Sequence, residues 1–144
     1  MTDNIKISFD VAASAPAHAI GLRVLLDNNV VYSNSHIQQD SVEIHAPDDS
    51  GDHELTIEMF GKTPEHTQID SNGTIVSDAL LAISNVCFDD IDITSILSEH
   101  AVYCHDFNGS GVKTQEQFYG NMGCNGTITM KFSSPVYLWL LEHL

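Results

Sequence analysis

The chain has 144 residues, with 20 acidic and 5 basic side chains, a net charge of −15 and 42% hydrophobic residues. This length suits one domain, and a disordered chain of this charge would be far poorer in apolar residues. The acidic surplus excludes nucleic acid and anionic membrane as expected partners, because phosphate binding depends on Lys and Arg. It is compatible with solubility, cation binding, a basic partner or a salt-adapted composition.

The first part of the chain alternates apolar and polar residues, as half-buried strands do. Ile5, Ile7, Phe9 and Val11 would share one face of the first strand. Asp27-Asn28-Asn29 predicts a tight turn, because Asn tolerates the left-handed conformation. Strands are therefore expected at 5–11, 20–26, 30–32, 42–45 and 53–60.

A polar segment rich in turn-forming residues follows at 61–77. Within it, Asp70-Ser71-Asn72-Gly73 predicts a minor hairpin, since Asn-Gly readily supplies two residues with positive φ. The Ile-, Val- and Leu-rich run 79–88 is expected to form a central strand buried on both faces. Asp89 and Asp90 would end this strand.

The last third of the chain mixes short elements. Thr94 is a candidate N-cap for one helical turn at 94–97, and the chain is expected to extend again at 101–104. A short pairing is expected at 117–119. In the strand 126–132, the side chains Ile128, Met130 and Phe132 would face inward, and Thr127, Thr129 and Lys131 would face outward.

Pro135 should end that strand, and the run Val136, Tyr137, Leu138, Trp139, Leu140 and Leu141 comes next. Because this segment is so apolar, it must either add a strand to the fold or be buried in contact with a partner. Turn signals between about eight to ten short strands predict an all-β fold, an antiparallel β-sandwich or jelly roll with one or two short helical turns. We expect a single domain, 1–144, with 136–144 as an apolar docking segment.

Two D-x-N-G sequences are candidate calcium loops, because calcium takes oxygen ligands from Asp, Asn and backbone carbonyls. Both lack the remaining ligands of an EF-hand, so each is also interpreted as a plain turn. The candidate metal ligands are Asp70, Asn72, Asp78, Asp106 and Asn108. No other cofactor is predicted.

Residues for catalysis are not arranged in any recognisable pattern. The chain has eight histidines but no HExxH spacing, no G-x-S-x-G elbow and no glycine-rich phosphate loop. The nearest cluster, His100, Cys104, His105 and Asp106, would place Cys104 and His105 on opposite faces of a strand, which disfavours zinc. We therefore expect a protein that is not an enzyme.

The cysteines and the N-terminus indicate where the protein is made. Cys87, Cys104 and Cys124 are odd in number and widely spaced, so free thiols are expected. Residues 1–9 have no basic region followed by an apolar run, which predicts no secretory signal and synthesis in a cytoplasm.

The central segments LTIEMFGKT, at 55–63, and SDALLAISNVCFDDIDI, at 77–93, resemble the calcium-dependent xylan-binding carbohydrate-binding modules. The resemblance implies a jelly roll and a calcium role for acidic residues such as Asp78. A sugar would need aromatic rings to stack on, and the candidates are Tyr32, Tyr103 and Tyr119. Trp139 lies in an apolar run, so it is assigned to packing.

The segments 54–59, 70–73, 91–93 and 137–142 resemble small single-domain β-sandwich proteins of marine tailed phages. This resemblance implies a structural component of a virion, such as a capsid decoration or tail-associated protein. Its partners would be other virion proteins, and we expect a homo-oligomer that docks through apolar and edge-strand contacts. The alternative function is a calcium-dependent module that recognises a host polysaccharide, and a hydrolase is the third alternative.

Overall fold

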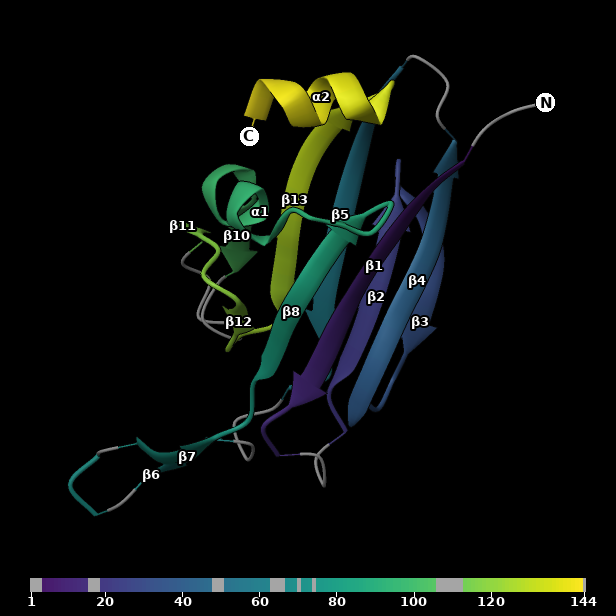
Figure 1. The fold of residues 1–144 in the computed structure, drawn as a ribbon. Coiled ribbons are helices and arrows are strands. Elements are labelled where there is room, and N and C mark those ends of the chain that lie inside the picture. Colours follow the sequence, from purple (N-terminus) through teal and green to yellow (C-terminus); the bar gives the residue numbers. More distant parts are fainter. Residues whose placement is uncertain are drawn as a thin grey trace.

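The computed structural model describes residues 4–15, 19–47, 51–62, 67–69, 71–73, 75–105 and 113–143. Two antiparallel sheets lie face to face as the layers of a β-sandwich (Figure 1). The six-stranded sheet contains, in spatial order, β11 (Thr114–Gln117), β10 (Val102–His105), β13 (Gly126–Ser133), β5 (Asp52–Phe60), β2 (Gly21–Leu26) and β3 (Asn29–Asn34). The five-stranded sheet contains β12 (Asn121–Met122), β8 (Leu81–Phe88), β1 (Asn4–Ala13) and β4 (Gln39–Pro47), and β9 (Ile91–Asp92) pairs with β8.

The core lies between the sheets and follows the alternation of the sequence. In β1, the side chains of Ile5, Ile7, Phe9 and Val11 are all buried, and the residues between them face outward. Ile57 of β5 lies opposite Ile128 of β13 and also opposite Val24 of β2, so the inner face is apolar across three strands. The predicted all-β sandwich is confirmed.

The C-terminal segment is a helix, α2 (Val136–His143), so of the two alternatives given for it the added strand is wrong. Figure 1 shows α2 across one end of the sandwich. Trp139 packs against Phe88 and Phe132, with ring centroids 5.7 and 6.2 Å apart, and Val136 and Leu140 are also buried. Periodicity does not distinguish helix from strand in a short, wholly apolar run, and helical spacing here brings three side chains to the core.

Two further predictions are wrong. The strand β8 is not buried on both faces, because Ser84 and Asn85 lie on the outer face of a two-layer sandwich and are exposed. The helix α1 (Thr94–His100) is longer than one turn, and Thr94 is not its N-cap. The Thr94 hydroxyl instead accepts a hydrogen bond from the Val86 N–H at 3.2 Å.

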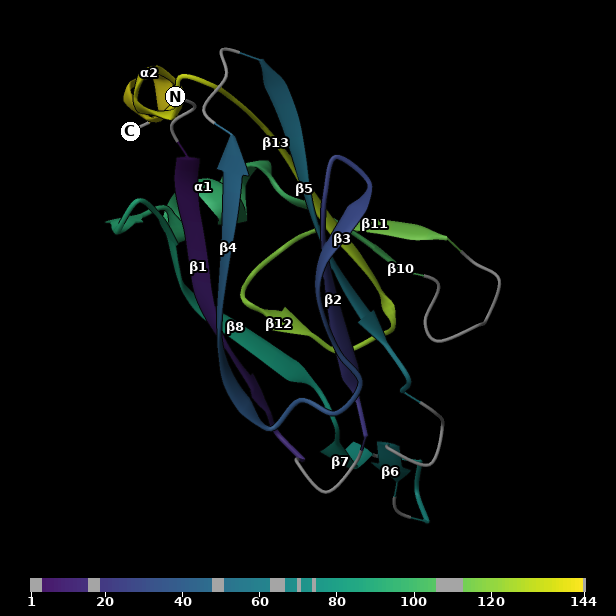
Figure 2. The same ribbon diagram turned by 90° about the vertical axis from the view of Figure 1, so that its right-hand side faces the viewer.

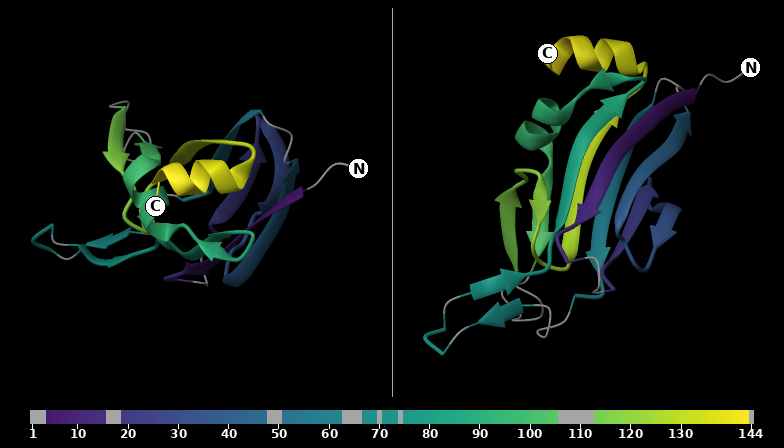
Figure 3. Two further views of the ribbon diagram at one scale, coloured as in Figure 1. Left: turned by 45° about the horizontal axis from the view of Figure 1, so that its top comes forward. Right: turned by 60° about the horizontal axis from the view of Figure 1, so that its bottom comes forward.

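The predicted turn after β2 is present, and β8 ends before Asp89 and Asp90 as expected. Asp27 and Asn28 have φ of 50° and 68°, and Asp89 and Asp90 have φ of 49° and 66°, so both pairs form left-handed two-residue connections between strands. A minor hairpin of β6 (Thr67–Ile69) and β7 (Ile75–Asp78) projects from the end of the sandwich opposite α2 (Figures 1 and 3). Within the described ranges, neither helix is long and apolar enough to cross a membrane.

Candidate ligand-binding groove

The outer face of the six-stranded sheet carries short side chains at its centre. Residues directly opposite one another in antiparallel strands project from the same face, so the register defines rows across the sheet. From β11 to β3, one row runs Gln117, Val102, Thr129, Thr56, Leu25 and Val30. The next row runs Gln115, Cys104, Thr127, Glu58, Arg23 and Ser33.

Along β10 this face is hollowed into a groove. Three adjoining hollows of about 330, 410 and 390 Å³ follow the strand and share Gln115 as a wall. We call this feature the β10 groove. Its central lining is His100, Val102, Cys104, Gln115, Thr127 and Thr129. Lys113 lies at one end, Lys131 lines the middle hollow, and Glu99, Glu116 and Gln117 line the hollow next to α1. Figure 2 shows β10 and β11 at one margin of the sandwich.

The middle of the groove combines an apolar floor with neutral polar walls. Val102 is 40% exposed and forms the apolar part. The Thr127 and Thr129 hydroxyls can each donate and accept a hydrogen bond, and the Gln115 amide does both with separate atoms. Ligand sites of this kind bury apolar surface and orient the ligand with a few polar groups. The arrangement therefore suits a ligand that carries both C–H surface and hydroxyl groups.

Tyr119, one of the predicted stacking residues, stands beside one end of the groove and is 76% exposed. Its hydroxyl donates to Gln117 Oε1 at 3.0 Å. The Gln117 amide in turn donates to the Ser98 carbonyl of α1 at 2.8 Å. Through this chain of hydrogen bonds, the position of an exposed aromatic ring is coupled to that of a groove residue. The stacking role of Tyr119 stays a prediction.

The other two predicted stacking residues do not present open rings. Tyr103 is 5% exposed, and its hydroxyl donates to the Cys124 carbonyl and accepts from the Cys124 N–H at 2.9 Å. Burial raises the pKa of Tyr103 to about 12. A stacking role for Tyr103 is therefore wrong, because its ring is part of the core. Tyr32 on β3 is half-buried and packs against the core.

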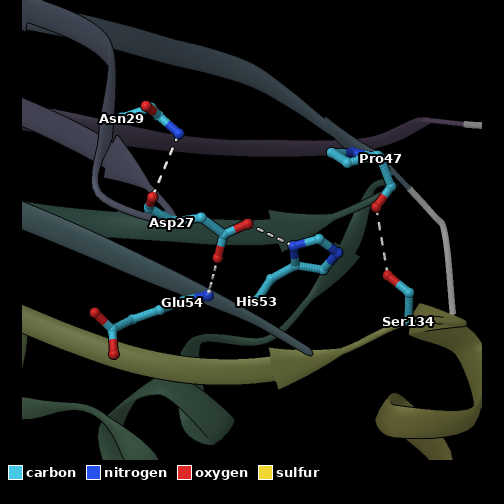
Figure 4. A network of polar contacts seen from close by, with 6 residues as sticks. All are labelled: Asp27, Asn29, Pro47, His53, Glu54 and Ser134. Atoms are coloured by element: carbon cyan, nitrogen blue, oxygen red, sulfur yellow. Dashed lines mark hydrogen bonds and ion pairs between the residues drawn. The ribbon is translucent and has the colours of Figure 1, made fainter. Parts of the chain in front are cut away.

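A second hollow, of about 470 Å³, lies at the end of the sheet near α2. Figure 4 shows the polar network beside it. Asp27 Oδ2 lies 2.7 Å from Nδ1 of the buried His53, and Asp27 Oδ1 accepts from the Glu54 N–H at 2.8 Å. The hydrogen bond to His53 lowers the pKa of Asp27 below its ordinary value. The network ties the β2–β3 turn to the start of β5, which indicates a structural role.

The predicted docking segment divides into two sets of residues. Val136, Trp139 and Leu140 belong to the core of the protein itself, so a docking role for these three is wrong. Tyr137, Leu138 and Leu141 are 54%, 58% and 71% exposed. They lie on the outward side of α2, where the Tyr137 hydroxyl donates to Asp89 Oδ2 at 3.3 Å. We call these three residues the α2 face.

The predicted calcium ligands are placed only in part. Asp70, Asp106 and Asn108 lie outside the described residues, Asn72 is exposed in the β6–β7 turn, and Asp78 belongs to β7. Among the described residues, no group of three or more His, Cys, Asp or Glu side chains is arranged to hold a metal ion. In the disfavoured zinc cluster, Cys104 lines the groove while His105 packs inward beside Tyr103. Calcium binding stays a prediction.

The groove residues were not identified as a site from the sequence. Alternation correctly placed Thr127, Thr129 and Lys131 on an outer face, but nothing in their spacing predicted β10 and β11 as neighbours. A signal that could have been used is the series of short hydroxyl side chains on the outer face of one strand. Short side chains there leave a hollow between the longer side chains of neighbouring strands.

Comparisons with known proteins support the fold. No protein-family model matches the chain, and no curated protein sequence matches it. Among solved structures, the chain is similar to "vCBM60 in complex with galactobiose", a carbohydrate-binding module, with a TM-score of 0.50 and 9% sequence identity. The match covers 87% of this chain and 96% of that chain. Nothing in these comparisons supports the resemblance to phage proteins. The architecture of the chain is thus that of a β-sandwich similar to a carbohydrate-binding module.

Proposed function

We propose that the protein is a non-catalytic carbohydrate-binding module that holds a glycan chain in the β10 groove. The observation that carries the proposal is the groove itself, an apolar floor between hydroxyl and amide side chains on the face of a sandwich. The similar solved structure is a module in complex with galactobiose, which makes a glycan the ligand to test first. Tyr119 adds an exposed ring next to the groove.

Filling the groove should remove glycan binding. Thr129 lies opposite Val102 on the outer face, so Thr129→Trp would place an indole over the groove floor. We expect at least a tenfold loss of affinity, or about 1.4 kcal/mol, measured by isothermal titration calorimetry with galactobiose and with xylohexaose. Thermal unfolding of the variant should stay close to that of the wild type, because the outer face has room for the side chain.

Ser8→Trp is the matched control, because Ser8 lies on the outer face of the other sheet, between Glu43 of β4 and Cys87 of β8. This variant should keep wild-type affinity. Equal affinity of Thr129→Trp and wild type would remove the groove from consideration, and no binding of either sugar by the wild type would count against the proposed function. Repeating each titration with calcium and with a chelator decides whether the binding is calcium-dependent, as the sequence resemblance implies.

A second candidate function is docking in a larger assembly through the α2 face. The observation in its favour is the exposed apolar surface of Tyr137, Leu138 and Leu141. Asp89 and Glu142 lie at its border, so the complementary partner has an apolar patch flanked by basic side chains. The sequence resemblance makes a virion protein the partner to test.

Leu138→Asp should abolish incorporation of the protein into such an assembly, because it places a charge in the apolar contact. Co-purification of tagged protein with the particles measures this. Val30→Asp, which places the same charge on a valine of β3 that is 55% exposed and away from α2, is the control for the added charge. Unchanged incorporation of the Leu138→Asp protein would rule out the α2 face as the anchor.

A further inference from the structure

Three of the five basic side chains of the protein are held by neighbours. Lys6 Nζ lies 2.7 Å from Asp90 Oδ1, the Arg23 guanidinium pairs with Glu58, and the buried Lys62 ammonium donates to the Gly123 carbonyl at 2.6 Å. Among the described residues, no ion pair or hydrogen bond engages the ammonium groups of Lys113 and Lys131. In a chain with 20 acidic side chains, the two basic groups left unengaged are the two that line the β10 groove.

The register gives the distance between these two groups along the groove. Lys113 directly precedes Thr114, which lies opposite His105, and Lys131 follows Thr129, which lies opposite Val102. The two lysines are therefore about six residue steps apart along β10, or about 20 Å at about 3.3 Å per residue. A single sugar cannot contact both lysines, whereas an oligosaccharide can.

The charges around the groove favour anionic groups only beside these two lysines. Between the lysines, the groove is lined by Val102, Cys104, Gln115, Thr127 and Thr129, which are uncharged. Of the nearby carboxylates, Glu58 pairs with Arg23, and Glu116 Oε2 lies 2.7 Å from His105 Nε2. Glu54 lies opposite Lys131 in the register and Glu99 lines the hollow beyond it, so both would repel a carboxylate placed past that lysine. The complementary ligand is hydroxylated in its middle and carries a carboxylate at each lysine.

We propose, resting on the glycan-binding function above, that the β10 groove takes a carboxylated oligosaccharide. A chain of uronate sugars has the required chemistry: hydroxyl groups for the threonines and Gln115, a C–H surface for Val102, and carboxylates that reach Lys113 and Lys131. The net charge of −15 repels such a chain at long range. This repulsion is screened beyond about 8 Å at physiological salt, whereas contacts inside the groove are screened less.

The test compares galacturonic acid hexamer with its fully methyl-esterified form, which has the same sugars without the charge. Calorimetry at physiological salt should give the acidic hexamer at least a fivefold higher affinity. Lys113→Gln and Lys131→Gln should each weaken its binding about fivefold, the upper range for an exposed charge pair. The double variant should lose about 25-fold, and binding of the esterified hexamer should not change in any of the three.

Lys6→Gln is the matched control, because it makes the same change in net charge on the outer face of the opposite sheet. It should leave the affinity for the acidic hexamer unchanged. Equal affinity for both hexamers, or equal losses in Lys6→Gln and Lys131→Gln, would overturn the uronate inference while leaving the proposed glycan-binding function intact. Binding of neither hexamer together with no binding of galactobiose would remove both. Equally tight, lysine-dependent binding of poly-glutamate would show recognition of charge without sugar and overturn the inference.

Discussion

Replacing Phe88 with alanine is expected to lower the free energy of unfolding by about 3–5 kcal/mol, the usual loss for a buried phenylalanine. Phe88 is 0% exposed, and its ring centroid lies 5.1 Å from that of Phe132 and 5.7 Å from that of Trp139. These three rings join β8, β13 and α2, so one deletion opens a cavity where both sheets and the helix meet. Urea denaturation measures the change in the free energy of unfolding. An unchanged slope of that free energy against urea concentration is the check on two-state unfolding.

Two further variants separate lost packing from a general effect of substitution. Phe88→Leu keeps most of the buried volume and should cost less than the alanine variant. Tyr119→Ala removes a ring that is 76% exposed and should change the stability by no more than about 0.5 kcal/mol. A loss below about 1 kcal/mol for Phe88→Ala would contradict a packed aromatic cluster at this end of the sandwich.

Replacing Gly126 with alanine is expected to cost about 1–3 kcal/mol and to remove binding in the β10 groove. Gly126 of β13 lies opposite His105 of β10. An added Cβ would overlap the Cys104 carbonyl oxygen and lie 2.9 Å from the His105 Cβ. Because the first of these is a backbone atom, β10 must move away from β13, and the floor of the groove moves with it.

Gly123→Ala is the natural comparison, since a Cβ at that position meets nothing within 4 Å. Chemical denaturation and hexasaccharide titration of both glycine variants should show a loss in Gly126→Ala alone. If Gly126→Ala folds with wild-type stability and affinity, then β10 and β13 are not packed as closely as described.

The strands could be predicted from the sequence because each one has a solvent-facing side. In β1 and β5, a polar residue stands between successive core residues, so the period of two is visible in the chain. The left-handed turns at 27–28 and 89–90 were likewise predictable, because Asp and Asn are among the few residues that tolerate positive φ.

The helix α2 was not predictable in the same way. Every residue from Val136 to Leu141 is apolar, so the sequence shows no alternation of apolar and polar residues that would distinguish a helix from a strand. The decision is made by tertiary packing, because Trp139 finds Phe88 and Phe132 at the ends of β8 and β13. Thr94 illustrates the same limit, since its hydroxyl is engaged by Val86, a residue of another element.

The β10 groove depends on pairings that local sequence does not encode. Its floor is Val102 and Cys104, one wall is Gln115, and the other is Thr127 and Thr129, from three strands with two intervening segments. The side of each strand that faces outward followed from alternation, but the order of the strands in the sheet did not. The hollow exists only because β13 pairs with β10 on one side and with β5 on the other.

The position of β13 also determines when, during folding, the β10 groove can form. In β13, Ile128 lies opposite Ile57 of β5, so the sheet is closed by partners from distant parts of the polypeptide. Closing such long loops is entropically costly and makes folding slow, typically milliseconds to seconds for all-β domains. During synthesis, β5 therefore keeps an unpaired edge until β13 has left the ribosome, and ligand affinity should appear only after β13 has paired with β5 and β10.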